Sequence, residues 1–169
     1  MSVIDDLSGG DPSTLPADVE LVVADVSDPG VVGLVAGLRP SRVVHAAAQV
    51  SVARSMTDPD RDRMVNLVGT AHVLEGARRG GAERFVFVSS GGAIYGEAAG
   101  VDESTPPAHA SYYGVNKYAA ERYVGLSSIP YAIARPSNVY GPGQRSDLEG
   151  GVVAIFCHRL AAGQPVTIY

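Results

Sequence analysis

Lysine and cysteine are nearly absent from this chain. Lys117 is the single lysine among 13 basic residues, so arginine serves almost wherever a cation is needed. Cys157 is the single cysteine, which excludes an internal disulfide and is typical of a reducing compartment. Cys157 and its neighbour His158 have no further ligands at a suitable spacing, so the pair does not indicate a metal site.

Positive charge and long apolar runs are also scarce. The net charge is −5, from 13 basic and 18 acidic residues without a basic cluster, which argues against a nucleic-acid partner. No apolar run approaches the roughly 18 residues that span a bilayer, and the N-terminus shows no secretory signal. A chain of 169 residues can form one domain with its own core. We expect it to be cytoplasmic, with no membrane partner.

Short β-rich runs alternate with longer helical patterns along the chain. This alternation implies right-handed crossovers and therefore predicts an α/β fold with a parallel sheet. The expected strands are 3–5 (the end of one), 20–25, 42–47, 84–89, 131–135 and 166–169. The expected helices are 29–38, 60–80, 111–124 and 152–162, with loops at 91–110 and 141–151. The helix at 60–80 rests on apolar residues at helical spacing: Met64, Leu67, Ala71, Leu74 and Ala77.

Polar and small residues follow the predicted strands, where parallel sheets bind their ligands. They are Asp5, Asp25, Val26, Ala46–Gln49, Ser89, Ser90 and Pro136–Asn138. Asp5 could accept hydrogen bonds from both hydroxyls of a ribose, or it could form a turn. Asp25 could accept from an adenine amino group, although Ser27 and Asp28 could instead cap a helix there. The alanines of 46–48 would admit a pyrophosphate or serve tight helix–sheet packing.

Tyr113 and Lys117 are separated by four residues on a predicted helix capped by Ser111. This spacing puts both side chains on one helical face, where an ammonium can stabilise a phenolate. The pair is therefore a candidate for proton transfer, and the alternative is a surface lysine beside a tyrosine. The glycines of 91–96 match neither the dinucleotide nor the P-loop spacing. The hydroxyl of Ser90 could instead bind a substrate oxygen near Tyr113, or satisfy backbone groups at the strand end.

Four motifs occur in a familiar order: Val43–Gln49, Ser89–Gly96, Tyr113-x-x-x-Lys117 and Arg135–Pro142. Together they resemble the extended short-chain dehydrogenase/reductases, and within these the NAD-dependent epimerase/dehydratases of nucleotide sugars. The similarity extends over essentially the whole chain, and it is greatest to the bacterial 4-epimerases of UDP-glucose. It implies a Rossmann-type, doubly wound parallel sheet that holds NAD.

The resemblance also implies a role for each matching residue. Cofactor binding would fall to Asp5 (ribose), Asp25 and Val26 (adenine), Ala46, Ala47, Ala48, Gln49, Asn66, Ser89, Tyr113, Lys117 and Pro136. Substrate binding would fall to Ser90, Tyr113 and Asn138, the last at the diphosphate. Tyr113, Lys117 and Ser90 would be catalytic, with Tyr113 as general base and its pKa lowered by Lys117 and the oxidised nicotinamide. No metal is implied.

The activity implied is NAD-dependent 4-epimerisation of a nucleotide sugar through a 4-keto intermediate, with UDP-glucose and UDP-galactose as the substrate pair. The alternatives are a UDP-glucuronate epimerase or decarboxylase, another nucleotide-sugar dehydratase, or a non-catalytic remnant that binds or dimerises. A 4,6-dehydratase is disfavoured because 91–93 lacks the Thr-Asp-Glu of those enzymes. A homodimer through helices 60–80 and 111–124 is expected, with Tyr118, Ala119 and Tyr123 as candidates to line it.

The sequence departs from the family pattern in several places. Residues 1–141 are expected to form the NAD-binding domain without its first βα unit, which carries the Gly-x-x-Gly-x-x-Gly turn. Residues 142–169 are expected to begin a substrate-binding region. The connection 125–129 is short. Gly91 stands where many relatives have the catalytic serine or threonine, which makes Ser90 the nearest candidate hydroxyl.

Overall fold

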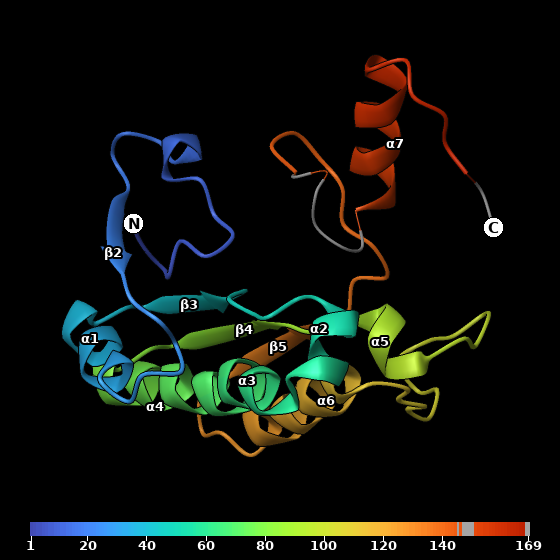
Figure 1. Cartoon of the computed structure of the whole chain (residues 1–169). Coiled ribbons are helices and arrows are strands. Elements are labelled where there is room, and N and C mark those ends of the chain that lie inside the picture. Colours follow the sequence, from blue (N-terminus) through green and yellow to red (C-terminus); the bar gives the residue numbers. More distant parts are fainter. Residues whose placement is uncertain (145, 147–150, 168–169) are drawn as a thin grey trace.

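The computed structural model describes residues 1–144, 146 and 151–167 (Figure 1). The strands are β1 (Ser2–Asp5), β2 (Glu20–Val23), β3 (Arg42–His45), β4 (Arg84–Val88) and β5 (Tyr131–Ala134). The helices are α1 (Val31–Leu38), α2 (Val52–Thr57), α3 (Pro59–Arg63), α4 (Thr70–Gly80), α5 (Gly91–Tyr95), α6 (Tyr112–Gly125) and α7 (Val152–Ala161). A 3₁₀ turn, η1 (Pro12–Thr14), and a π-helical segment, η2 (Met64–Gly69), complete the elements.

The strands form two parallel sheets. β1 pairs with β2, while β3, β4 and β5 form a second sheet with β4 at its centre. The register of the second sheet aligns Phe85 with Val43 on one side and with Tyr131 on the other. Within the described part of the chain, no ladder joins the two sheets. The predicted alternation of parallel strands and helices is confirmed.

The core lies between the strands and a layer of helices on one face. Figure 1 shows α1, α3, α4 and α6 beneath the strands. Phe85 and Phe87 of β4 are fully buried in this layer, together with Val124 of α6. Val44 of β3 is 68% exposed, as expected for a side chain on the other face of the sheet. The arrangement leaves the carboxyl ends of the strands accessible for a site.

The predicted helix at 60–80 is one continuous helical segment, formed by α3, η2 and α4 in succession. Asp58 caps its start by accepting a hydrogen bond from the backbone N–H of Arg61 at 3.1 Å. Gly81 ends it in the left-handed conformation, with φ of 81°, as the Gly80-Gly81 stop signal predicts. The π-helical stretch in its middle was not predicted, and such stretches occur often at functional sites.

Three expectations differ from the structure. α2 lies in a stretch that was assigned to no element, and α5 begins the expected loop 91–110, where Ser90 accepts a bond from the N–H of Ala93. The expected strand at 166–169 is absent at residues 166 and 167, and 168–169 lie outside the described residues. Most of 145–150, within the expected loop 141–151, also lies outside them. No described helix is long and apolar enough to cross a bilayer.

Candidate functional site

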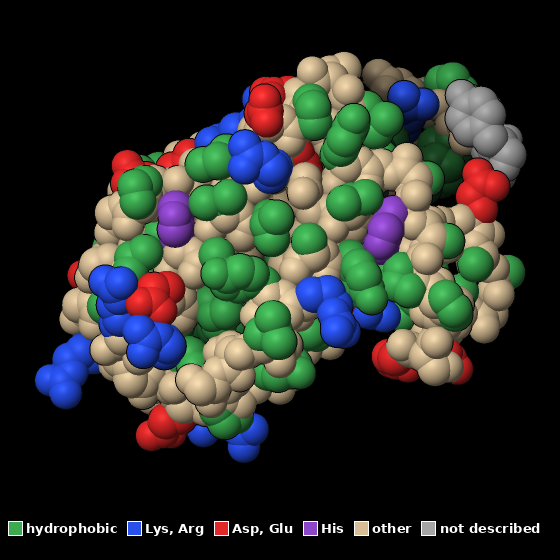
Figure 2. Space-filling view, turned by 90° about the horizontal axis from the view of Figure 1, so that it is seen from below, with side chains coloured by type: hydrophobic (Ala, Val, Ile, Leu, Met, Phe, Trp, Pro, Cys, Tyr) green, Lys and Arg blue, Asp and Glu red, His purple; other side chains and the backbone are tan. Residues whose placement is uncertain are grey.

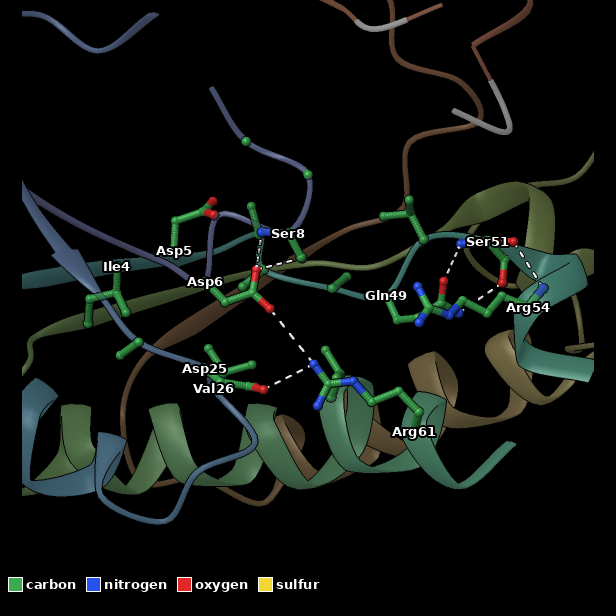
Figure 3. A pocket seen from close by; sticks show the side chains of 18 residues that line it. Ile4, Asp5, Asp6, Ser8, Asp25, Val26, Gln49, Ser51, Arg54 and Arg61 are labelled. Atoms are coloured by element: carbon green, nitrogen blue, oxygen red, sulfur yellow. Dashed lines mark hydrogen bonds and ion pairs between the residues drawn. The ribbon is translucent and has the colours of Figure 1, made fainter. Parts of the chain in front are cut away.

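A cavity of about 410 Å³ opens at the carboxyl ends of β1, β2 and β3 (Figure 3). The predicted residues that line it are Asp5, Asp25, Val26 and Ala46–Gln49. Parallel strands place their ends at one edge, so residues distant in sequence meet there. The structure therefore brings together every residue that was predicted at these three strand ends.

The carboxylates of the cavity are held by short-range hydrogen bonds. Asp5 accepts a bond from the N–H of Leu7 at 2.7 Å, so it forms the turn considered from the sequence while lining the cavity. Asp25 accepts from the N–H and hydroxyl of Ser27, at 2.8 and 2.7 Å. Burial raises the pKa of Asp25, but the bonds from Ser27 and Arg61 outweigh burial and hold that pKa below its ordinary value.

Arg61 connects the ends of β1 and β2 across the cavity, and no pattern in the sequence singled it out. Its guanidinium lies 3.0 Å from Asp25 and 3.8 Å from Asp6 (Figure 3). It also donates to the Ser27 hydroxyl at 3.1 Å. Because Arg61 lies on α3, it ties the long helix to the sheet edge. Its positive charge partly offsets the carboxylates at this end of the cavity.

Asn66 supports the loop after β3 through its side-chain amide. Its side-chain oxygen accepts from the N–H of Gln49 at 3.1 Å, and its Nδ2 donates to the carbonyl of Gln49 at 2.9 Å. The Gln49 side chain in turn donates to the carbonyl of Ser51 at 2.8 Å and accepts from its N–H at 2.7 Å. The backbone that lines the cavity at 49–51 is therefore fixed by amide side chains.

Asp62 is a second residue that sequence reasoning missed. Its carboxylate is fully buried and accepts bonds from Gln49, Asn66 and Asn116. No apolar pattern could have indicated it, because Asp62 and Asn66 are polar residues on the most buried side of the helix. The signal available was their four-residue spacing, which puts both on one helical face.

Tyr113 and Lys117 are both buried on α6, with exposed fractions of 8% and 2%. Lys117 Nζ donates to the carbonyl of Val88 at 2.6 Å and lies 4.4 Å from the centre of the Phe87 ring. Burial lowers the pKa of Lys117 to about 8, although Glu121 and Asp62 act in the opposite direction. The alternative of a surface lysine is therefore wrong, and the ammonium is placed at the end of β4.

The pKa of Tyr113 corrects one expectation. Burial raises this pKa above its ordinary value and the charge of Asp62 raises it further, while a hydrogen bond with Ser90 lowers it. The lowering was expected from Lys117 together with the oxidised nicotinamide, and Lys117 by itself does not produce it. The physical reason is that removing a phenol from water penalises its charged form, and the Lys117 ammonium bonds to a backbone carbonyl.

Ser89, Ser90 and Gly91 follow β4 directly. The hydroxyl of Ser89 is buried without a hydrogen-bond partner among the described residues. The Ser90 hydroxyl lies close enough to Tyr113 to lower the pKa of that phenol, so a substrate oxygen held by Ser90 would lie near Tyr113. A Cβ at Gly91 would lie 2.9 Å from the carbonyl oxygen of Arg135, so the backbone after β5 leaves no room for a hydroxyl side chain there.

Pro136 and Asn138 follow β5 and lie apart from the residues that line the cavity. Pro136 is half-buried, and its carbonyl accepts a bond from the N–H of Gly91 at 2.9 Å. Asn138 is exposed. Among the described residues, no group of three or more His, Cys, Asp or Glu side chains is arranged to hold a metal ion.

Two named relatives match nearly the whole chain. The UDP-glucose 4-epimerase of Mycolicibacterium smegmatis is 40% identical over 177 aligned positions, which cover 98% of this chain and 56% of that protein. A putative UDP-glucose 4-epimerase of Methanocaldococcus jannaschii is 36% identical, and the alignment covers 99% of this chain and 57% of that protein. The chain thus spans a little more than half the length of these relatives.

Two solved structures of UDP-glucose 4-epimerases also match nearly the whole chain. The UDP-glucose 4-epimerase of Thermotoga maritima, solved with UDP-glucose, is 38% identical with a TM-score of 0.92, covering 99% of this chain and 57% of that one. The Thermus thermophilus UDP-glucose 4-epimerase, in complex with NAD, is 40% identical with the same TM-score of 0.92 and the same coverage. The expected Rossmann-type fold is therefore confirmed.

The family itself matches residues 1–169, without a gap at either end of the chain. With relatives at 36–40% identity and the strand-end site in place, the resemblance seen in the sequence is confirmed. This chain belongs to the NAD dependent epimerase/dehydratase family.

Proposed function

We propose that the chain carries the cofactor and proton-transfer site of an NAD-dependent nucleotide-sugar 4-epimerase, with UDP-glucose and UDP-galactose as substrates. The observation that carries the proposal is the buried Tyr113–Lys117 pair near Ser90 at the carboxyl end of β4, the strand that pairs with β3, whose end lines the cavity. A tyrosine held beside a lysine on one helical face can transfer a proton to or from a substrate hydroxyl. The relatives named UDP-glucose 4-epimerase support this substrate class.

The described residues fit a dinucleotide. The cavity has carboxylates at the ends of β1 and β2, which suit ribose and adenine, and small residues at 46–48, which allow close approach. A Cβ at Gly10 would lie 3.2 Å from Asp5 Oδ1, so glycine keeps that carboxylate accessible. The buried hydroxyl of Ser89, which has no hydrogen-bond partner among the described residues, offers the dinucleotide a further polar contact at the end of β4.

The resemblance assigns the adenosine ribose to Asp5, the adenine to Asp25 and Val26, and the nicotinamide ribose to Lys117. When bound, NAD supplies the acceptor and donor of hydride for the sugar. The positive charges of bound NAD and of Lys117 would favour the phenolate of Tyr113 against the effect of burial, and Tyr113 would then take the proton from the sugar 4-hydroxyl and return it, while Ser90 holds the same oxygen. With a pKa of about 8, Lys117 is largely protonated at neutral pH and supplies positive charge at the end of β4.

We also propose that the protein is a cytoplasmic homodimer through 60–80 and α6. Figure 2 shows hydrophobic side chains gathered on the face that these helices cover. Val115 and Tyr123 of α6 are 47% and 53% exposed, so both side chains are available to a partner on this face. Tyr118 and Ala119, also expected at this surface, are half-buried.

The experiment uses the purified chain with NAD and UDP-galactose. Release of NAD on denaturation, or its binding by titration, is expected together with conversion to UDP-glucose. Tyr113→Phe should retain NAD and lose conversion by at least about 100-fold, because it removes only the proton acceptor. Absence of NAD binding by the folded wild-type chain would overturn the proposal and favour a binding or dimerising remnant.

A further inference from the structure

Asp62 is a buried carboxylate on α3 to which the roles above assign no task. We propose that Asp62 is a positioning residue for Tyr113 and Lys117: it ties the loop after β3 to α6 and sets a fixed negative charge near the Lys117 ammonium. The inference rests on the proposed function, because positioning presupposes that Tyr113 and Lys117 act on a substrate. It adds a residue that the four sequence motifs do not contain.

Three amide groups donate hydrogen bonds to Asp62. Gln49 Nε2 and Asn66 Nδ2 both donate to Oδ1 at 2.9 Å, and Asn116 Nδ2 donates to Oδ2 at 2.7 Å. An ionised carboxylate only accepts hydrogen bonds, so three donors match its requirements. Burial of a charge is costly unless such partners compensate it, and here they are supplied by neutral groups.

Each donor belongs to a segment that builds the site. Gln49 lies in the loop that lines the cavity, and Asn66 grips the same residue through its backbone N–H and carbonyl. Asn116 directly precedes Lys117 on α6. A single carboxylate therefore connects the cavity wall to the helix that carries the proton-transfer pair.

Asp62 also begins a buried polar stripe along the long helix. Asp62, Asn66 and Thr70 recur every four residues and are all buried, and the π-helical segment η2 lies between the first and the last. Thr70 donates to the carbonyl of Asn66 at 2.8 Å, and His45 Nε2 lies 3.0 Å from its hydroxyl. His45 in turn stacks on the ring of Phe87. Lys117 Nζ lies 4.4 Å from the centre of the same ring, so these contacts lead from the stripe to Lys117.

The charged and titratable groups around Lys117 come from three elements. Tyr113 and Glu121 lie on α6, His45 on β3 and Asp62 on α3. The negative charges of Glu121 and Asp62 oppose the effect of burial and raise the pKa of Lys117. Loss of the Asp62 charge should therefore make the ammonium easier to deprotonate.

Lys117 allows a direct test because it is the only lysine. The whole chain, labelled with ¹³C at lysine Cε, gives one lysine signal whose chemical shift against pH reports the titration of Lys117. Asp62→Asn and Asp62→Ser remove the charge, and the serine avoids placing a new N–H against three donors. Both should lower the midpoint, by on the order of half a pH unit or more. Asp62→Glu should keep it close to the wild-type value.

Asp60→Asn is the matched control. It removes a carboxylate from the same helix, but that side chain is 91% exposed and pairs with Arg63, so the midpoint should not move. An unchanged midpoint in a folded, uncharged Asp62 variant would overturn the proposal. Failure of both uncharged variants to fold while Asp62→Glu folds would also overturn it, in favour of a purely structural role.

A kinetic measurement separates this inference from the proposed function. In the assay with NAD and UDP-galactose, Asp62→Ser should have a kcat about 10-fold or more below that of the wild-type chain, with little change in KM. The pH profile of its kcat should also be displaced. A lowered Lys117 midpoint without any epimerisation by the wild-type chain would reject the proposed function and the positioning role, leaving the charge coupling alone. Epimerisation with an unaltered kcat and pH profile in Asp62→Ser would reject only the inference.

Discussion

At the scale of single residues, the ammonium of Lys117 lies where charge is penalised. Its pKa is about 8 in the folded chain against an ordinary 10.5, so the unfolded state binds the proton more tightly. The free-energy cost of burying the Lys117 charge is fully present below pH 8 and disappears as the pH rises toward 10.5. The free energy of unfolding should therefore increase by about 3 kcal/mol across this pH range. Urea unfolding of the wild type and of Lys117→Met, at intervals across this window, measures it. Equal pH slopes for the two proteins would contradict it.

His45 has the corresponding effect in acid. Burial, with a smaller contribution from Lys117, lowers the pKa of His45 from 6.5 to about 3. The folded state keeps the imidazole neutral while the unfolded state charges it, so stability falls as the pH drops below 6.5. His45→Phe keeps the stacking on Phe87 and removes the titration, so it should lose about 3 kcal/mol less than the wild type between pH 7 and pH 4. Denaturant unfolding at both values decides this, and parallel losses would count against it.

At the scale of elements, the close contact of α1 with α4 requires a glycine at position 76. A Cβ at Gly76 would lie 2.7 Å from Val35 Cβ and 2.9 Å from the Val32 carbonyl oxygen. Gly76→Ala should therefore destabilise the fold by about 1–3 kcal/mol despite the better helix propensity of alanine. Gly33→Ala on α1, where no atom lies within 4 Å of the new Cβ, is the control and should be neutral or stabilising. Thermal unfolding compares the two, and similar shifts would show that the contact can relax.

Most of the helices and strands could be predicted from the sequence. Periodicity and stop signals predicted the five strands, α1, α6, α7 and the long helix, because each has a continuous pattern of its own. Five apolar residues were expected on the buried face of the long helix: Met64, Leu67, Ala71, Leu74 and Ala77. Leu74 and Ala77 are buried, whereas the other three are half-buried and Asp62, Asn66 and Thr70 are more buried than they are. A search for apolar periodicity does not detect a buried polar stripe, because its polar groups find their hydrogen-bond partners only in the folded chain.

The same limit applies to the site. Strand-end residues were predictable because parallel topology places them at one edge, and the Tyr113–Lys117 pair because its spacing is local. Arg61 and Asp62 were missed because their partners, Asp25 and Asn116, lie far away in sequence. The rise in the Tyr113 pKa that burial causes in the chain without NAD could not be foreseen, because burial cannot be judged from the sequence.

At the scale of the whole molecule, the proposed homodimer can be tested through its exposed tyrosine. Tyr123 of α6 is 53% exposed, and a carboxylate in its place would be buried without a partner in a dimer interface. Tyr123→Glu should therefore convert dimer into monomer in sedimentation velocity with little change in unfolding. Leu160→Glu on α7, where the side chain is 62% exposed, is the control and should leave the assembly unchanged. A wild-type chain that sediments as a monomer would refute the dimer.

The separation of the strands into two sheets has a consequence for local opening. β4 has a neighbour on each side and two fully buried phenylalanines, whereas β1 and β2 bond only to each other within the described chain. Hydrogen exchange should therefore follow a hierarchy, with the slowest amides in β4 and much faster ones in β1 and β2. The part of the cavity formed by β1 and β2 would then belong to a unit that opens on its own, while the Tyr113–Lys117 pair on α6, packed behind β4, stays closed. Binding of the nucleotide would couple these two units and slow exchange in the first.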